Sequence, residues 1–155
     1  MAGLYQESSG NVSYINNDGY SIIVGKNSAT SYPQTTVLVS GNPSTSIATY
    51  TKIGKASIDP SLFTTVDSIT FEAWFETSSI ANAASVRLFN YTDNVTVTDA
   101  TLTTVSTTGS HQTVTITLPS SNKEYEVHLK LDSSDPSQLA VCHRATVTIY
   151  KKELG

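Results

Sequence analysis

The second half of the chain is a series of short segments in which apolar and polar residues alternate. Between residues 68 and 151 one such segment follows another, and no window there has the 3.6-residue period of an amphipathic helix. Successive side chains of a strand point to opposite faces of a sheet, so a period of two indicates half-buried antiparallel strands. The alternating apolar positions are Ile69, Phe71, Ala73, Phe75, Val86, Leu88, Val95, Val97, Val114, Ile116, Leu118, Tyr125, Val127, Leu129, Leu131, Ala145, Val147 and Ile149.

The length of 155 residues is enough to bury one sizeable core. We expect an all-β protein, an antiparallel jelly-roll-like sandwich of eight to nine strands over residues 20–155, preceded by an extended N-terminal arm over residues 1–19. Several connections are too long for tight hairpins, which favours Greek-key crossings. An immunoglobulin-like sandwich is the alternative, although it normally has only ~100 residues. The expected strands are 20–24, 35–39, 47–53, 68–76, 85–91, 95–97, 113–118, 125–131 and 141–151, with residues 54–63 as a crossing segment.

Hydroxyl groups supply most of the polarity of this chain. It contains 22 Ser and 23 Thr, whereas charged residues make up only 14%, well below the roughly 25% of an ordinary soluble domain. The net charge is −4 and the cations are scattered, which argues against nucleic-acid binding. No apolar run approaches the ~20 residues that cross a bilayer, and residues 1–19 lack the pattern of a secretory signal.

The sequence offers no grouping of residues that would perform chemistry. Cys142 is the single cysteine and lies beside His143, but neighbours on a strand point to opposite faces, so we expect a buried structural thiol. His111 and His128 lie far from His143 and from each other, without the spacing of zinc ligands. Turn preferences explain the loops that contain Asp. We therefore expect no enzymatic activity, no metal and no cofactor.

An aromatic patch is the first candidate binding surface. Because residues 69–75 bury their odd-numbered members, Trp74 faces outward, and Arg87, Phe89 and Tyr91 share the outward face of the following strand. If the two strands are neighbours, these four residues form one exposed patch that marks a partner surface or a sugar platform. Alternatively, the arm or a neighbouring loop covers them.

The N-terminal arm is the second candidate. It cannot form a core alone, yet it contains several apolar and aromatic residues, and segments of this kind gain order by packing on a partner. The arm residues expected to contact a partner are Leu4, Tyr5, Tyr14 and Ile15.

Four runs of the sequence, residues 68–73, 85–90, 125–131 and 145–149, resemble the sandwich core of bacteriophage virion accessory proteins such as head-decoration, cement and head-fibre proteins. The resemblance implies a jelly-roll protomer, frequently trimeric, that binds the major capsid protein or another virion protein and reinforces the capsid. It also implies assembly in the host cytoplasm and a place on the virion exterior. A carbohydrate-binding or adhesin module of the same class is the alternative, with Trp74 and Tyr91 stacking on a glycan.

Overall fold

The computed structural model describes residues 3–6, 12–15, 21–25 and 31–152, and it describes side chains for residues 33–151. The chain divides into two compact units. Met1–Tyr32 together with Lys152–Gly155 form one unit, and Pro33–Lys151 form the other.

The described residues of the first unit form a small antiparallel sheet with the strand order β1-β2-β3. The segment predicted as an arm contributes the first two strands, and the strand predicted at residues 20–24 is observed as the third. That third strand pairs with β2, so the unit extends to Tyr32, whereas the predicted arm ended at Gly19. The bounds are β1 Gly3–Gln6, β2 Val12–Ile15 and β3 Ser21–Gly25.

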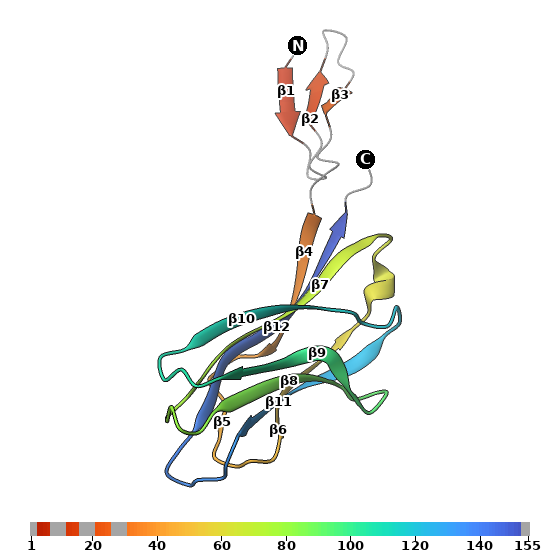
Figure 1. The fold of residues 1–155 in the computed structure, drawn as a ribbon. Helices are drawn as coiled ribbons and strands as arrows, with labels where there is room; N and C mark the ends of the chain where they lie inside the picture. Colours follow the sequence, from red (N-terminus) through yellow and green to blue (C-terminus); the bar gives the residue numbers. More distant parts are fainter. Residues whose placement is uncertain (1–2, 7–11, 16–20, 26–30, 153–155) are drawn as a thin grey trace. The chain divides into compact units, whose positions relative to one another are not determined.

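The second unit is a sandwich of two antiparallel sheets (Figure 1). One sheet has the order β10-β7-β12-β4, with the short β5 also paired to β12, and the other has the order β6-β11-β8-β9. A single turn of 3-10 helix, η1, joins β6 to β7, and the described residues contain no α-helix. The elements are β4 Ser31–Val39, β5 Ser44–Thr45, β6 Thr51–Ile58, η1 Pro60–Leu62, β7 Val66–Thr77, β8 Ala84–Asn90, β9 Val95–Thr104, β10 Ser110–Ile116, β11 Lys123–Leu131 and β12 Ala140–Lys152.

The strand order is that of a jelly roll. When β5 is left out and the eight longer strands are counted along the chain, the two sheets read 1-8-3-6 and 2-7-4-5. Only β8 and β9 are both consecutive and paired, and the other connections lead to strands that are not direct partners. This arrangement of eight strands in two Greek keys defines the jelly roll. The predicted fold is confirmed, and the immunoglobulin-like alternative is not.

The core lies between the two sheets and is built by the alternation seen in the sequence. Along β7 the inward residues Ile69, Phe71, Ala73 and Phe75 are all buried, as predicted. Their partners come from both sheets, since β11, β8 and β12 supply aliphatic side chains with almost no exposed surface. At roughly 25 cal/mol for each Å² of apolar surface buried, this interior is the main source of stability. The largest fully buried side chains are Tyr125, Phe71, Phe75, Leu88, Leu129 and Leu131.

Two predicted boundaries near residue 50 are wrong. The strand expected at residues 47–53 begins only at Thr51, because the backbone before it bonds to the last residue of β11 and to the loop that follows β11. The Ile47 carbonyl accepts from the Leu131 amide at 2.9 Å, and the Ser46 carbonyl accepts from the Asp135 amide at 3.0 Å. The segment expected to cross between strands from residue 54 belongs to β6 as far as Ile58, where it pairs with β11.

Gly54 explains why a glycine lies inside β6. A Cβ atom at this position would be 2.0 Å from the carbonyl oxygen of Leu38 and 2.8 Å from Cγ2 of Val39. The backbones of β6 and β4, which are the edge strands of opposite sheets, therefore approach each other more closely than any side chain allows. In the sequence this glycine indicates the end of a strand, but in the structure it permits the closure of one side of the sandwich.

Candidate functional site

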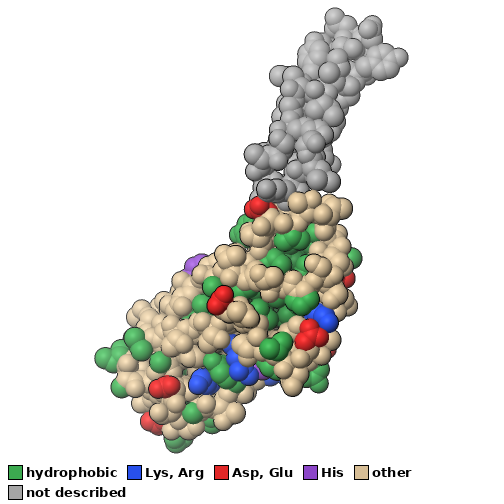
Figure 2. All heavy atoms as spheres, turned by 45° about the vertical axis from the view of Figure 1, so that its right-hand side comes forward, with side chains coloured by type: hydrophobic (Ala, Val, Ile, Leu, Met, Phe, Trp, Pro, Cys, Tyr) green, Lys and Arg blue, Asp and Glu red, His purple; other side chains and the backbone are tan. Residues whose placement is uncertain are grey.

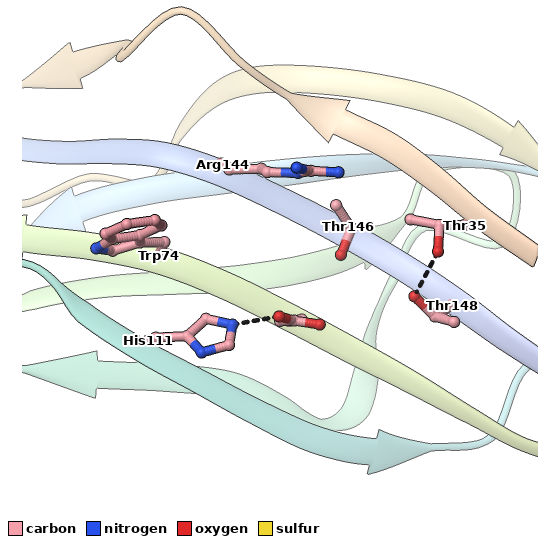
Figure 3. A pocket seen from close by; sticks show the side chains of 7 residues that line it. Thr35, Trp74, His111, Arg144, Thr146 and Thr148 are labelled. Atoms are coloured by element: carbon pink, nitrogen blue, oxygen red, sulfur yellow. Dashed lines mark hydrogen bonds and ion pairs between the residues drawn. The ribbon is translucent and has the colours of Figure 1, made fainter. Parts of the chain in front are cut away.

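A groove of about 430 Å³ lies on the outer face of the β10-β7-β12-β4 sheet. Figure 3 shows the side chains that line it, with Arg144, Thr146 and Thr148 in a row along β12 and Trp74 on β7 beside them. The groove is partly polar and partly apolar, and its volume is within the range of ordinary ligand sites. Its lining residues are Thr35, Glu72, Trp74, His111, Arg144, Thr146 and Thr148.

The strand register brings these residues together from four strands. Trp74 on β7 is the backbone partner of His111 on β10 and of Arg144 on β12. One step along the face, Glu72 is the partner of Thr146. Directly opposed residues on one face of a sheet are close neighbours, so residues between 37 and 74 positions apart in the sequence form one continuous surface.

Trp74 is the exposed centre of the site, with 52% of its surface accessible. The ring of His143 meets it edge-on at a centroid distance of 6.1 Å, and the ring of His111 is tilted against it at 6.4 Å. The loop before β10 also lies against the indole, since a Cβ atom on Gly109 would be 2.6 Å from Nε1 of Trp74. The indole is therefore supported on several sides while part of its surface stays open.

The two histidines beside Trp74 are each paired with a glutamate from β7. Glu72 and Glu76 lie two residues before and after Trp74 and share its face of the sheet. His111 Nε2 is hydrogen-bonded to Glu72, and His143 Nε2 is hydrogen-bonded to Glu76. Both carboxylates next to the indole thus already have a partner within the chain.

Arg144 has no such partner. Its side chain is exposed, and within the described residues its guanidinium makes no hydrogen bond or ion pair. Farther along β12 the hydroxyl-bearing residues Thr146 and Thr148 are largely buried, and the Thr148 hydroxyl is 3.1 Å from that of Thr35 on β4. The site therefore combines an aromatic platform, a free cation and a row of hydroxyl groups.

The outer face of the other sheet is organised differently, because its arginine is enclosed. The guanidinium carbon of Arg87 lies 4.0 Å from the centroid of the Tyr50 ring and 5.2 Å from that of Phe89. Its Nε donates to Nδ1 of His128 at 3.1 Å, and His128 stacks on Phe89 and donates to Glu126 at 3.0 Å. The polar and aromatic groups on this face satisfy one another.

The aromatic patch predicted from the sequence is divided between the two faces. Trp74 belongs to β7 in one sheet, whereas Arg87 and Phe89 belong to β8 in the other, so the four residues do not meet. The prediction of outward orientation is correct, but the assumption that the strands are neighbours is wrong. Tyr91 is 57% exposed in the turn after β8 and does not line the groove.

The predicted arm residues lie in the first unit. Leu4 and Tyr5 are in β1, and Tyr14 and Ile15 are in β2, where only the backbone is described. Leu4 is the backbone partner of Tyr14, and Tyr14 is the partner of Ile22 on β3. A contact between these residues and a partner remains a prediction.

Cys142 is buried, as expected. Burial raises the pKa of its thiol to about 12, and the thiol donates to the Arg144 carbonyl at 3.5 Å. His143 lies on the outer side with Glu76. Within the described residues, no group of three or more His, Cys, Asp or Glu side chains is placed to hold a metal ion. No helix in that part of the chain is long and apolar enough to span a membrane.

No family model matches the chain, and no curated protein matches it. Among solved structures, the chain is similar to VP2 of infectious bursal disease virus in a subviral particle, with 15% identity over 94% of this chain and 42% of that one, at a TM-score of 0.47. It is also similar to a structure of the Gx strain of the same virus, with 14% identity over 92% and 46% of the two chains, at a TM-score of 0.41. The chain spans less than half the length of both.

Proposed function

We propose that this protein is a virion structural protein, a decoration or cement protein that binds an assembled bacteriophage capsid from outside and stabilises it. The observation that carries the proposal is the strand order, 1-8-3-6 facing 2-7-4-5. Double-sheet jelly rolls with this architecture form the domains of many viral capsid proteins and lectins.

The filled interior supports a role at the outer surface. Some jelly rolls hold a ligand or metal between their sheets, which requires a cavity lined by polar groups. Here that space is occupied by the side chains of Phe71, Phe75, Leu88 and Leu129, none of which is exposed. Binding by this sandwich is therefore assigned to its faces, edges and loops.

The surface composition supports a role in assembly. Figure 2 shows that on the face in view, charged side chains are few and scattered among uncharged ones. Removing a charge from water costs far more than removing a hydroxyl that finds a hydrogen bond. A surface rich in Thr and Ser can thus be covered by a partner at a modest desolvation cost.

The first unit is the proposed site of attachment. Its small sheet places Leu4, Tyr14 and Ile22 opposite one another in the backbone register. A three-stranded sheet needs an apolar face packed on something to be stable, and the major capsid protein or another virion protein would provide that cover. The proposed assembly is a homotrimer, as in the family that the sequence resembles.

The test uses capsids purified from a phage whose gene for this protein is deleted. Full-length protein should co-sediment with them saturably and raise the temperature at which they release DNA. Deleting residues 2–16 should weaken binding at least tenfold, about 1.4 kcal/mol, while cooperative unfolding of the sandwich is retained. Absence of co-sedimentation by the full chain would refute the proposal. Equally tight binding by the truncated protein, or its failure to fold, would refute the role of the arm.

The oligomeric state is tested separately by sedimentation equilibrium. A trimer should give three times the chain mass of 16.6 kDa. A monomer at high micromolar concentration would contradict the proposed trimer and leave the capsid-binding test unaffected.

A further inference from the structure

The arginines on the two outer faces of the sandwich have different surroundings. Arg87 is covered by two aromatic rings and donates to His128. Arg144 lines the groove and has no hydrogen-bond or ion-pair partner among residues 33–151. A guanidinium presents a planar fork of N–H donors that matches a carboxylate. The groove thus offers a free cation, and the acidic residue of its lining, Glu72, already binds His111.

The open indole of Trp74 is the second element of the site. It is the direct cross-strand neighbour of Arg144, and Gly109 and two histidine rings limit its movement. An aromatic group that is already held in place loses little entropy when a ligand binds. Because the face of an aromatic ring is negative, it attracts the slightly positive C–H groups on the flat side of a sugar ring.

We propose that this groove binds an acidic saccharide. A sugar ring lies on the Trp74 indole, and a carboxylate of the saccharide forms a bidentate ion pair with Arg144. At the far end of the groove the exposed Thr35 on β4 lies beside the largely buried Thr148, and the Thr35 hydroxyl can exchange hydrogen bonds with sugar hydroxyls (Figure 3). This inference goes beyond the proposed capsid-binding function, because it concerns a different surface and a different ligand.

Other classes of ligand match the residues of the groove less well. A neutral sugar would leave the Arg144 guanidinium without an anion. A peptide strand added to a sheet needs a free edge, whereas Trp74 lies on β7, inside the sheet between β10 and β12. A nucleic acid would meet one free arginine on a chain with a net charge of −4, and nucleic-acid affinity depends on several neutralised phosphates.

The test begins with a glycan array probed with the labelled full-length protein. The array carries sialylated, uronic-acid and neutral glycans, and binding is expected on acidic glycans. The strongest ligand and its counterpart without the carboxylate are then titrated while the protein fluorescence is recorded. Trp74 is the single tryptophan of the chain, so its emission should change with the acidic glycan at concentrations at least tenfold lower than with the neutral one.

Variants then locate the site by isothermal titration calorimetry. Trp74→Ala and Arg144→Gln should each weaken binding of the acidic glycan at least tenfold, and Arg144→Gln should abolish the preference over the neutral counterpart. The matched controls Tyr91→Ala and Arg87→Gln change an exposed aromatic and an arginine outside the groove, and both should bind within twofold of the original protein.

Several results would overturn the inference. These are no binding to any acidic glycan, equal binding of the neutral counterpart, or unchanged affinity in Trp74→Ala. Failure here is distinguishable from failure of the capsid proposal, because Trp74→Ala should co-sediment with capsids as the original protein does.

Discussion

Replacing Tyr125 by Phe should stabilise the protein. Tyr125 lies on β11 with its side chain fully buried in the core, and its hydroxyl oxygen has no hydrogen-bond partner among the residues that the structure describes. A buried polar group without a partner costs about 1–3 kcal/mol of folding free energy. Phe keeps the ring and removes only this oxygen, so we expect a gain of about 1 kcal/mol, which corresponds to roughly 2–4 °C in Tm for a chain of this size.

Urea unfolding measures this change directly. The midpoint should rise while the slope m stays constant, because both proteins expose the same surface on unfolding. Tyr91→Phe is the matched control, since it removes a hydroxyl from an exposed tyrosine and should change stability by less than about 0.5 kcal/mol.

Alkaline pH adds an independent check. Burial, followed by the negative charge of Asp93, raises the pKa of Tyr125 to about 12 from the usual 10.0. The unfolded chain therefore loses this proton first, and the original protein loses stability as the pH rises from 10 towards 12. Tyr125→Phe lacks this contribution, so the difference in the free energy of unfolding between the variant and the original protein should increase between pH 10 and pH 12. A variant about 1 kcal/mol less stable than the original at pH 7 would show that the hydroxyl is hydrogen-bonded and would refute the reasoning.

Three further changes test the packing. Gly54→Ala should destabilise the protein by about 3 kcal/mol or more in urea, whereas Gly41→Ala, with a φ of 82° but open space around it, should cost only about 1 kcal/mol; equal effects would contradict the close approach at Gly54. Asn82→Ala removes three side-chain hydrogen bonds from a residue that is 6% exposed and should cost about 3 kcal/mol in thermal unfolding, so a loss below about 1 kcal/mol would show that they contribute little. Cys142 should react with a thiol reagent at least about 100-fold more slowly in the folded protein than in urea, and rapid labelling without unfolding would contradict its burial.

The faces of the strands could be predicted from the sequence, because a period of two fixes which side chains are buried. This holds for β7, where Phe71 and Phe75 are inside and Trp74 is outside. The partners of each strand could not be predicted, since almost all pairings in this fold join strands that are distant along the chain. That is why the alternation assigns Trp74 and Phe89 correctly to outward faces but does not show that they lie on different sheets.

Most residues of the groove cannot be predicted from the sequence for the same reason. His111 and Arg144 carry no motif, and only the register brings them beside Trp74. A local signal was present, because Glu72 and Glu76 flank Trp74 at the spacing that puts all three side chains on one face. The sequence predicts the end of a strand at Gly54, because no sequence pattern shows that another backbone will pass so close to it.

The pairing of β4 with β12 also decides how the sandwich carries a mechanical load. Thr35 lies against Thr148, and the carbonyl of Pro43 accepts from the amide of Cys142, so the two strands run in opposite directions. The chain therefore enters and leaves the sandwich at the same end. Tension that pulls these two exits apart would break the hydrogen bonds between β4 and β12 one after another. It would not load the whole row of bonds at the same time. Tension that pulls both exits the same way would leave that pair unloaded, and the load would pass into the sandwich through β4, at the edge of its sheet, and through β12, inside the same sheet.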